Sequence, residues 1–359
     1  MNKYKVGIIG ATGMVGQRFV ALLSKHPWFE ISVLAASASS AGKSYEHALG
    51  RRWVMSTPIP DEVKNMLVFD AKADAEIVAA AADFVFCAVN LDSLSTRLLE
   101  ERYAVLECPV ISCNSACRML PDVPMIIPEI NPEHADVIAA QRKRLGTKRG
   151  FIAVKSNCSI QSYVPALHPL RKFGLTKALV CTYQAISGAG KTFDRWPEII
   201  DNIIPYISGE EEKSEHEPLK IWGKVEHGEI VNAALPQITT QCLRVPVSDG
   251  HTAAVFASFE HAPDEHEIKA IWQSFAGEPQ KLNLPSAPAR FIRYFDEPER
   301  PQPRLDRDFE HGMGISVGRL RRDSIFDYKF VCLSHNTVRG AAGGAILLAE
   351  LLAAKGYFD

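Results

Sequence analysis

The chain has 359 residues, of which 47% are hydrophobic and 23% are charged, a composition typical of a globular protein with room for two domains. Its formal net charge of −2 gives no electrostatic reason to expect binding to nucleic acid or to an anionic membrane. No apolar run approaches the ~20 residues that span a bilayer, and the N-terminus leads into a strand without a signal-peptide pattern. We therefore expect a cytoplasmic protein.

The first part of the chain alternates between strand and helix patterns. An apolar run over residues 3–9 predicts a buried parallel strand, and the glycine loop Gly10–Gly16 follows it. A helix with one apolar face comes next and ends before Pro27. Further strands are expected at residues 31–35, 84–89 and 109–112, with a helix over residues 92–102. This alternation predicts an α/β fold, a Rossmann-type doubly wound parallel sheet.

The glycine loop predicts a dinucleotide site, because backbone N–H groups between a strand and a helix can approach a pyrophosphate. Its spacing is G-x-x-G-x-x-G rather than the strict G-x-G-x-x-G, so a structural turn is the alternative. The loop residues expected to bind the cofactor are Gly10, Thr12, Gly13, Met14, Val15 and Gly16.

The end of the second strand favours NADP over NAD. An NAD site would place Asp or Glu there to bind the ribose hydroxyls, whereas this chain has a run of small residues and hydroxyls. No carboxylate in that run would repel a 2′-phosphate. The residues expected to bind the 2′-phosphate are Ser37, Ser39, Ser40 and Lys43.

Cys158 is the strongest catalytic candidate. It follows the apolar run 151–154, and helical spacing resumes at Tyr163, Val164 and Leu167. We predict that Cys158 lies where a strand turns into a helix, so that the helix dipole lowers the thiol pKa and favours the thiolate. A buried, inert cysteine is the alternative. A nucleotide loop together with a poised thiol suggests oxidation or reduction of an acyl group held on sulfur.

Eight cysteines in a chain of this length do not indicate a disulfide framework. Cys108, Cys113 and Cys117 lie close together, but they form no C-x-x-C pair and have no histidine nearby. We therefore expect no metal site.

Beyond Cys158 the strands lengthen and alternate between polar and apolar residues. They are expected at residues 178–186, 241–247 and 252–259. These longer, alternating strands predict a second, mixed α+β domain. The acidic run Glu210-Glu211-Glu212 predicts a solvated face, and residues 337–355 predict a core helix packed back on the first domain. We expect residues 1–155 and 337–359 to form the nucleotide-binding domain and residues 156–336 to form the second.

Seven segments in order make the chain resemble aspartate-β-semialdehyde dehydrogenase over nearly its whole length, in the variant common in archaea and fungi and also found in some bacteria. They are Gly10–Gly16, Ala36–Lys43, Ser156–Gln161, Tyr183–Gly190, Glu217–Lys220, Arg244–His251 and Asn336–Gly344. The resemblance implies that the second domain serves catalysis and dimerisation. It also implies a homodimer or homotetramer.

The resemblance implies roles for residues around the thiol. Cys158 would be the nucleophile that forms a thioacyl-enzyme, and His251 would be its acid/base partner. Gln184 would position the acyl group. Arg244 would bind the substrate α-carboxylate through its planar guanidinium, and Glu217 would face the substrate amine.

Two further groups of residues follow from the same resemblance. Lys220, Arg118 and Asn157 would form the subsite for an acyl-phosphate or for inorganic phosphate. The expected contacts to the nicotinamide end of the cofactor are Ser187, Gly188 and Asn336.

The implied reaction is the NADPH-dependent reduction of L-aspartyl 4-phosphate to L-aspartate 4-semialdehyde, which feeds diaminopimelate and lysine, threonine, methionine and isoleucine synthesis. Malonyl-CoA reductase is the closest alternative and N-acetylglutamyl-phosphate reductase a more distant one. Glu217 and Arg244 favour a substrate with both an amine and a carboxylate. A redox-sensing or NADP-sensing regulator is an alternative of another class, but it leaves His251, Arg244 and Lys220 without a purpose.

Overall fold

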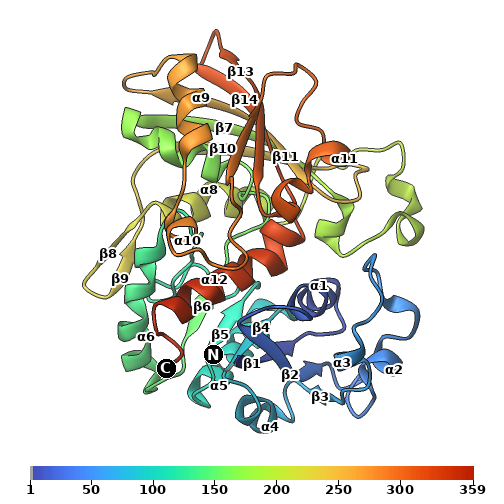
Figure 1. Ribbon diagram of the computed structural model, residues 1–359. Coiled ribbons are helices and arrows are strands. Elements are labelled where there is room, and N and C mark those ends of the chain that lie inside the picture. Colours follow the sequence, from blue (N-terminus) through green and yellow to red (C-terminus); the bar gives the residue numbers. More distant parts are fainter. Residues whose placement is uncertain (1–2) are drawn as a thin grey trace.

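The computed structural model describes residues 3–359, which build two six-stranded sheets (Figure 1). The first sheet has the strand order β3-β2-β1-β4-β5-β6, and all its strands are parallel. This is the strand order of a doubly wound dinucleotide-binding sheet. Its elements are β1 (Tyr4–Ile9), α1 (Met14–Leu23), β2 (Phe29–Ala36), α2 (Tyr45–Leu49), α3 (Asp61–Lys64), β3 (Val68–Asp70), α4 (Ala75–Ala80), β4 (Phe84–Cys87), α5 (Ser93–Val105), β5 (Val110–Ser112), α6 (Ile138–Leu145) and β6 (Ile152–Val154).

The second sheet is mixed, with the order β10-β7-β11-β14-β13-β12. Its outer pairs β10–β7 and β12–β13 are parallel, and the pairs between them are antiparallel. The elements after β6 are α7 (Val164–Leu167), β7 (Leu175–Gln184), α8 (Glu210–Ile221), β8 (Lys224–Glu226), β9 (Glu229–Val231), β10 (Gln237–Arg244), β11 (His251–Phe259), α9 (Glu265–Ser274), α10 (Glu278–Lys281), β12 (Ile292–Phe295), α11 (Pro303–Asp306), β13 (Ile315–Arg322), β14 (Tyr328–Ser334) and α12 (Gly343–Ala354). The mixed second domain predicted from the sequence is therefore present.

Proline changes the bounds of two predicted segments, the end of one strand and the start of one helix. The strand expected at residues 241–247 is β10, which ends at Arg244, because Pro246 has no backbone N–H to continue a ladder. The helix expected after Cys158 begins only at Val164, as the four-residue α7. Pro165 would clash with the carbonyl four residues earlier if the helix extended upstream.

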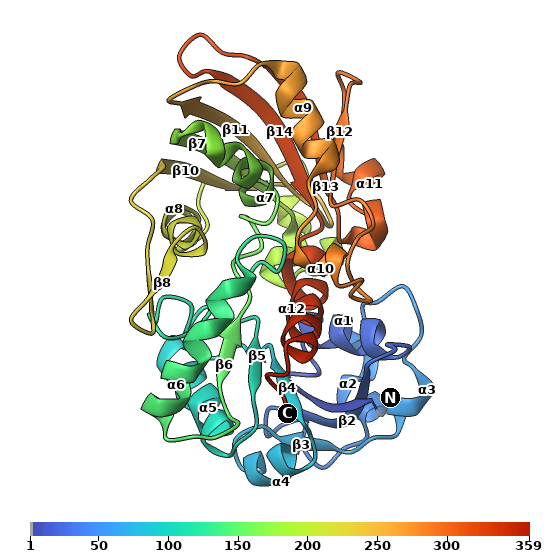
Figure 2. The ribbon, with the colours of Figure 1, turned by 60° about the vertical axis from the view of Figure 1, so that its left-hand side comes forward.

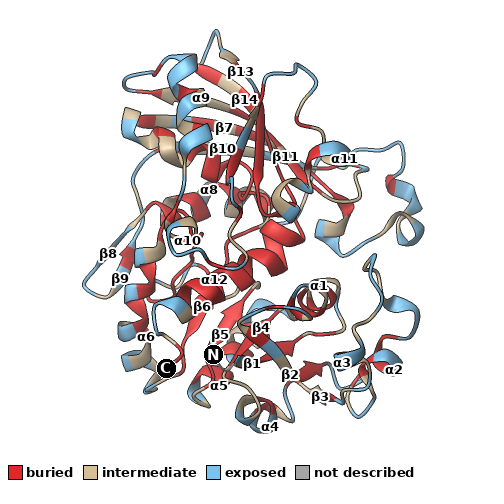
Figure 3. Ribbon diagram, in the orientation of Figure 1, coloured by how far each residue is buried: buried red, intermediate tan, exposed pale blue. Residues whose placement is uncertain are grey.

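The C-terminal helix α12 lies between the two sheets in both ribbon views (Figure 1, Figure 2). Every residue from Gly343 to Leu352 is buried, as the red colour of this helix shows in Figure 3. A helix that is apolar on nearly all sides belongs in a core, and the one charged residue of α12, Glu350, has a buried partner in His26 Nε2 at 2.8 Å. Its leucines pack in one cluster with Val6 and Phe84 of the first sheet, as the sequence predicts. A five-residue π-helix, Val338–Ala342, precedes α12 and brings the chain to Cys158.

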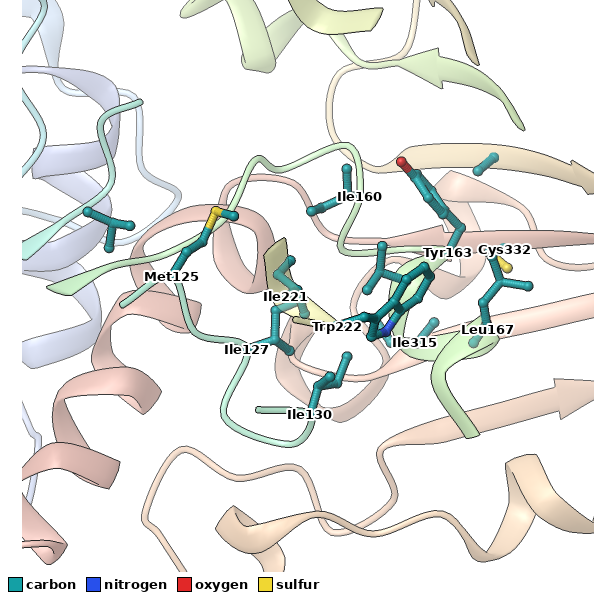
Figure 4. Packing of buried hydrophobic residues seen from close by; sticks show 14 of the residues in the cluster. Met125, Ile127, Ile130, Ile160, Tyr163, Leu167, Ile221, Trp222, Ile315 and Cys332 are labelled. Carbon is teal, nitrogen blue, oxygen red and sulfur yellow. The ribbon is translucent and has the colours of Figure 1, made fainter. Parts of the chain in front are cut away.

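A second apolar cluster joins the loops after β5 to the second domain (Figure 4). Met125 and Ile127 come from the loop before α6, and Trp222 follows α8. Ile160 and Tyr163 belong to the turn that carries Cys158 and are fully buried in this cluster. The turn is therefore anchored on the C-terminal side of the cysteine. Within residues 3–359, no helix has both the length and the hydropathy needed to cross a membrane.

Candidate active site

The glycine loop closes tightly over the first strand. Gly10 has a φ of +88°, and a Cβ built there would lie 2.3 Å from the Ala88 carbonyl oxygen. A Cβ on Gly16 would lie 2.2 Å from the Gly10 carbonyl oxygen, so α1 packs directly on the loop. Gly13 caps α1 without a side chain, which leaves the first N–H groups of α1 open to an anion.

A cavity of about 590 Å³ lies beside this loop. Gly10, Thr12, Gly13 and Ser37 line it, as the sequence predicts. Three charged side chains at the cavity have no counterpart among the predicted residues, namely Arg52, Asp70 and Lys72. Asp70 and Lys72 arrive with β3, which lies beside β2 only in the folded sheet, so no local sequence signal indicates them.

The residues expected to bind a 2′-phosphate divide into two groups. Ser37, Ser39 and Lys43 are exposed at the turn after β2. The Ser37 and Ser39 hydroxyl oxygens lie 3.0 Å apart, and Lys43 Nζ donates to the Ser39 carbonyl at 2.7 Å. Ser40 is buried, so the first three residues are the better candidates.

Two smaller cavities lead from the nucleotide loop towards the thiol. A cavity of about 330 Å³ shares Val89, Asn90 and Leu91 with the large one. A cavity of about 140 Å³ contains Cys158 together with Val15 of α1. Their other lining residues include the predicted site residues Arg118, Asn157, Ser187, Gly188 and Asn336. The fold therefore brings the predicted cofactor loop and the predicted nucleophile to one continuous region.

Cys158 does not lie at a helix N-terminus. β6 ends at Val154 and α7 begins at Val164, so the turn around Cys158 has no helix dipole behind it. Burial raises the pKa of the thiol, the Glu210 carboxylate raises it further, and the cations Lys155, Arg118 and Arg244 lower it. The prediction that a helix start activates the thiol is therefore wrong, and any activation must come from side-chain charges.

His251 lies beside the thiol, with Nε2 3.5 Å from Cys158 Sγ. It is the first residue of β11. The Ala185 backbone N–H donates to His251 Nδ1 at 3.0 Å, so the neutral ring carries its proton on Nε2. Burial, reinforced by the positive charge of Arg244, holds the pKa of His251 well below its usual range. The ring is therefore a neutral donor that points at sulfur.

Asn336 fixes the turn before His251. Its Oδ1 accepts from the Gly250 N–H at 2.8 Å, and its Nδ2 donates to the Ser187 hydroxyl at 2.9 Å. Ser187 and Gly188 belong to the loop after β7, and a Cβ on Gly188 would lie 3.1 Å from His251 Nε2. This loop therefore covers the imidazole and needs a residue without a side chain at position 188.

Arg244 and Gln184 end adjacent strands in direct register. Arg244 Nη1 donates to the Ala185 carbonyl at 2.8 Å, and no other hydrogen-bond partner of its guanidinium lies within the described part of the chain. The remaining donors can hold a carboxylate. Gln184 is buried, and its Nε2 lies 3.3 Å from Glu210 Oε2.

Glu217 is buried and has partners on both oxygens. Arg118 Nη1 donates to Oε1 at 2.8 Å, and the Asn157 backbone N–H donates to Oε2 at 2.6 Å. Arg118 also donates to the Lys155 and Cys113 carbonyls, so the guanidinium is buried rather than solvated in a surface loop. The Glu217 carboxylate is therefore occupied within the protein.

Lys220 lies away from the expected phosphate subsite. Its Nζ donates to the carbonyls of Arg118, Leu120 and Val123 at 2.6, 2.6 and 2.8 Å. Burial lowers its pKa to about 8. All three N–H bonds of the ammonium are used, so Lys220 stabilises the 118–123 loop instead of presenting a charge to a ligand.

Glu210 is a site residue that the sequence interpretation missed. It is 9% exposed and accepts from Asn157 Nδ2 at 3.0 and 3.1 Å, so the prediction of a solvated face is wrong for this residue. It lines the cavity of about 330 Å³ with Lys213. The buried positions Glu210, Ser214 and Glu217 follow the i, i+4, i+7 spacing of one helix face, the signal that could have identified Glu210.

A buried hydrogen-bond network stabilises the turn that carries Cys158. Gln161 Nε2 donates to the Ser156 hydroxyl at 2.7 Å, and Arg339 Nε donates to Gln161 Oε1 at 3.0 Å. Arg339 forms a bidentate pair with Glu129 at 2.7 and 2.6 Å. The π-helix therefore ties the catalytic turn to the first domain, and π-helical segments are frequent at functional sites.

Comparisons with known proteins agree with this arrangement. Residues 5–138 match the family model of the semialdehyde dehydrogenase NAD binding domain, and residues 167–339 match that of the dimerisation domain. Aspartate-semialdehyde dehydrogenase of Archaeoglobus fulgidus is 44% identical over 353 residues, which cover 98% of each chain. The Saccharomyces cerevisiae enzyme is 40% identical, with 99% of each chain covered. The crystal structure of aspartate semialdehyde dehydrogenase with NADP from Candida albicans superposes with a TM-score of 0.88 at 41% identity, covering 99% of this chain and 100% of that one.

Proposed function

This chain belongs to the aspartate-semialdehyde dehydrogenase family, and we propose that it reduces L-aspartyl 4-phosphate to L-aspartate 4-semialdehyde and phosphate, reversibly and with NADPH. One observation carries the proposal. The Cys158 thiol lies 3.5 Å from the His251 imidazole in a region that opens onto a glycine-loop nucleotide site. The product would serve the synthesis of lysine, through diaminopimelate, and of threonine, methionine and isoleucine.

NADP is the proposed cofactor. The open first turn of α1 suits a pyrophosphate. Ser37 lines the cavity of about 590 Å³, and Ser39 and Lys43 on the same turn offer further donors to a 2′-phosphate. The structurally similar enzyme from Candida albicans was solved with NADP. When bound, NADPH supplies the hydride that reduces the thioester.

The residues around the thiol divide the chemistry between them. The Cys158 thiolate attacks the β-carbonyl, a carbon–sulfur bond forms, and the carbon–oxygen bond to phosphate breaks. Because His251 carries its proton on Nε2, this N–H can donate a hydrogen bond to the carbonyl oxygen that becomes negative during the attack. When the reduced thiohemiacetal collapses, the carbon–sulfur bond breaks and Cys158 returns as the thiolate.

The substrate subsites follow from the charged side chains around the thiol. Arg244 holds the α-carboxylate with its unpaired guanidinium nitrogens. Glu217 would face the amine, and Asn157 joins it to a second buried carboxylate, Glu210, so that negative charge gathers at this subsite. Arg118 and Asn157 line the cavity of about 330 Å³ that would take the phosphate.

We extend the proposal to domain organisation and assembly. Residues 1–155 and 337–359 form the nucleotide-binding unit and residues 156–336 the catalytic unit. The match of residues 167–339 to a dimerisation domain supports a homodimer built through the catalytic unit. Two such dimers would form a tetramer.

The decisive experiment compares two substrate pairs on the purified protein. We expect turnover of aspartate semialdehyde with phosphate and NADP, followed as NADPH formation at steady state. Malonyl-CoA with NADPH should give no comparable kcat/KM. A preference for malonyl-CoA would contradict the proposed substrate while leaving the cysteine chemistry in place.

A further inference from the structure

Lys155 is a buried cation without an ionic partner. It is 3% exposed, and its ammonium donates to the carbonyls of Ser156 and Gly340. Within residues 3–359, no carboxylate oxygen lies within 4.0 Å of its Nζ. An ammonium has three donors, so one N–H remains. Burying a charge is costly unless a partner compensates it, and the structure should therefore supply an anion.

The candidate anions are the Cys158 and Cys113 sulfurs, because both thiols line the same cavity of about 140 Å³ as Lys155. Cys158 is favoured by a shared neighbour. Gly340, whose carbonyl binds the ammonium, also packs on Cys158, since a Cβ on Gly340 would lie 2.8 Å from Cys158 Cβ. One peptide of the π-helix thus touches both side chains.

The imidazole cannot take this role. A charged His251 would carry a proton on Nδ1, and that proton would point at the Ala185 N–H, which already donates to Nδ1 at 3.0 Å. His251 is therefore neutral in this geometry. Arg118 is paired with Glu217, and Arg244 is needed for a substrate carboxylate. Lys155 is the remaining cation.

We propose that Lys155 is the counter-ion of the Cys158 thiolate, in place of the imidazolium that a cysteine–histidine pair would use. Ionisation of the thiol releases one proton to water and converts a buried pair of net charge +1 into a neutral pair. The inference rests on the proposed function only in taking Cys158 as the nucleophile.

The surrounding charges are consistent with mutual stabilisation. Burial lowers the pKa of Lys155 to about 8, Arg118 lowers it further, and Cys113, Cys158 and Glu217 raise it. For Cys158, burial and Glu210 raise the pKa of the thiol, and Lys155 comes first among the cations that lower it. Removing Lys155 should therefore raise the pKa of the thiol.

The test is the pH dependence of Cys158 alkylation by iodoacetamide, followed on the Cys158 peptide by mass spectrometry without substrate. In Lys155→Met, the apparent thiol pKa should rise by about one unit or more, the effect expected from losing a nearby opposite charge. Lys155→Arg keeps the charge and should stay close to the wild type. Lys220→Met is the matched control, because Lys220 is equally buried and bound by carbonyls but does not line the thiol cavity.

An unchanged thiol profile in folded Lys155→Met, together with a higher KM for phosphate, would overturn the proposal and make Lys155 a phosphate ligand. A second measurement, on a different variant, tests the proposal if the Lys155 variants fail to fold. In Cys158→Ala, the pKa of Lys155, followed by NMR of ¹³C-labelled lysine, should fall, and an unchanged value would also overturn the pair. Neither titration uses a substrate, so a different natural substrate would leave both results intact.

Discussion

The two ends of the proposed active site are built in different ways. The cofactor end is centred on two short contiguous segments, Gly10–Gly16 and Ser37–Lys43, and its glycine loop depends on backbone shape. Arg52, Asp70 and Lys72 add charges to its cavity from other segments. The thiol end is assembled from the turn after β6, the loop around Arg118, helix α8 and the first residues after β7. It depends on buried side-chain charges and their hydrogen bonds.

This difference predicts how the two ends respond to substitution. At the cofactor end a side chain added to a glycine should act through steric clashes and change binding or folding. At the thiol end, replacing one charge or one donor should change the chemistry while the backbone stays in place. The variants below compare these two expectations.

The largest effect is expected for Cys158→Ala. Removing the nucleophile should lower kcat by several orders of magnitude, because no thioester can form. NADP affinity should remain nearly unchanged, since the glycine loop and the Ser37–Lys43 turn lie on the first sheet. Steady-state kinetics and a fluorescence titration of NADPH measure the two quantities. Substantial residual turnover of aspartate semialdehyde would show that Cys158 is not the nucleophile.

The next effect is expected for Arg244→Lys. An ammonium cannot form the two parallel bonds that a guanidinium gives a carboxylate. Misplacing the substrate by about 1 Å can cost on the order of a hundredfold in rate. We therefore expect kcat to fall and KM to rise. An aldehyde without the α-carboxylate is the control substrate and should be much less affected. Equal losses for both substrates would mean that the carboxylate is held elsewhere.

The sequence was sufficient for the features that depend on local spacing. The glycine loop, the strand before Cys158 and the buried C-terminal helix follow from hydrophobic periodicity and glycine positions. The residues around the thiol could be placed only through a family resemblance. Their contacts join segments about a hundred residues apart, such as Arg118 and Glu217, and no spacing rule reports such contacts.

The errors at the thiol end have a common cause. The spacing around Val164 predicts a helix that reaches back to Cys158, but Pro165 prevents it. Lys220 and Glu217 share a helix face, but burial and backbone carbonyls determine which groups they bind. Glu210 belongs to a charged run that usually faces solvent, yet its first residue turns inward. Tertiary packing decides each of these cases.

Two glycine variants separate folding from cofactor binding at the other end. In Gly16→Ala the new Cβ would lie 2.2 Å from the Gly10 carbonyl, so the free energy of unfolding should fall by about 1–3 kcal/mol. In Gly13→Ala the nearest atom lies 3.4 Å away, an ordinary contact, so the protein should fold normally. Its NADP affinity should nevertheless fall about tenfold, because the methyl group faces the approaching pyrophosphate. Denaturant unfolding measures the stability of Gly16→Ala, and NADPH titration measures the affinity of Gly13→Ala. A normal affinity in Gly13→Ala would mean that the pyrophosphate binds elsewhere.

The smallest effect is expected for Lys43→Ala, which tests the preference for NADP. Lys43 is exposed and braces the turn through the Ser39 carbonyl at 2.7 Å. A contact between exposed charges is weak, so the ratio of kcat/KM for NADP over NAD should fall by only about two- to fivefold. The loss should shrink at high salt, because salt screens such contacts. Lys64→Ala is the control, since Lys64 is a partly exposed lysine that pairs with Glu46 and lies outside the turn after β2. An unchanged ratio at low salt would move the 2′-phosphate towards Arg52 and Lys72, the cations that line the cavity of about 590 Å³.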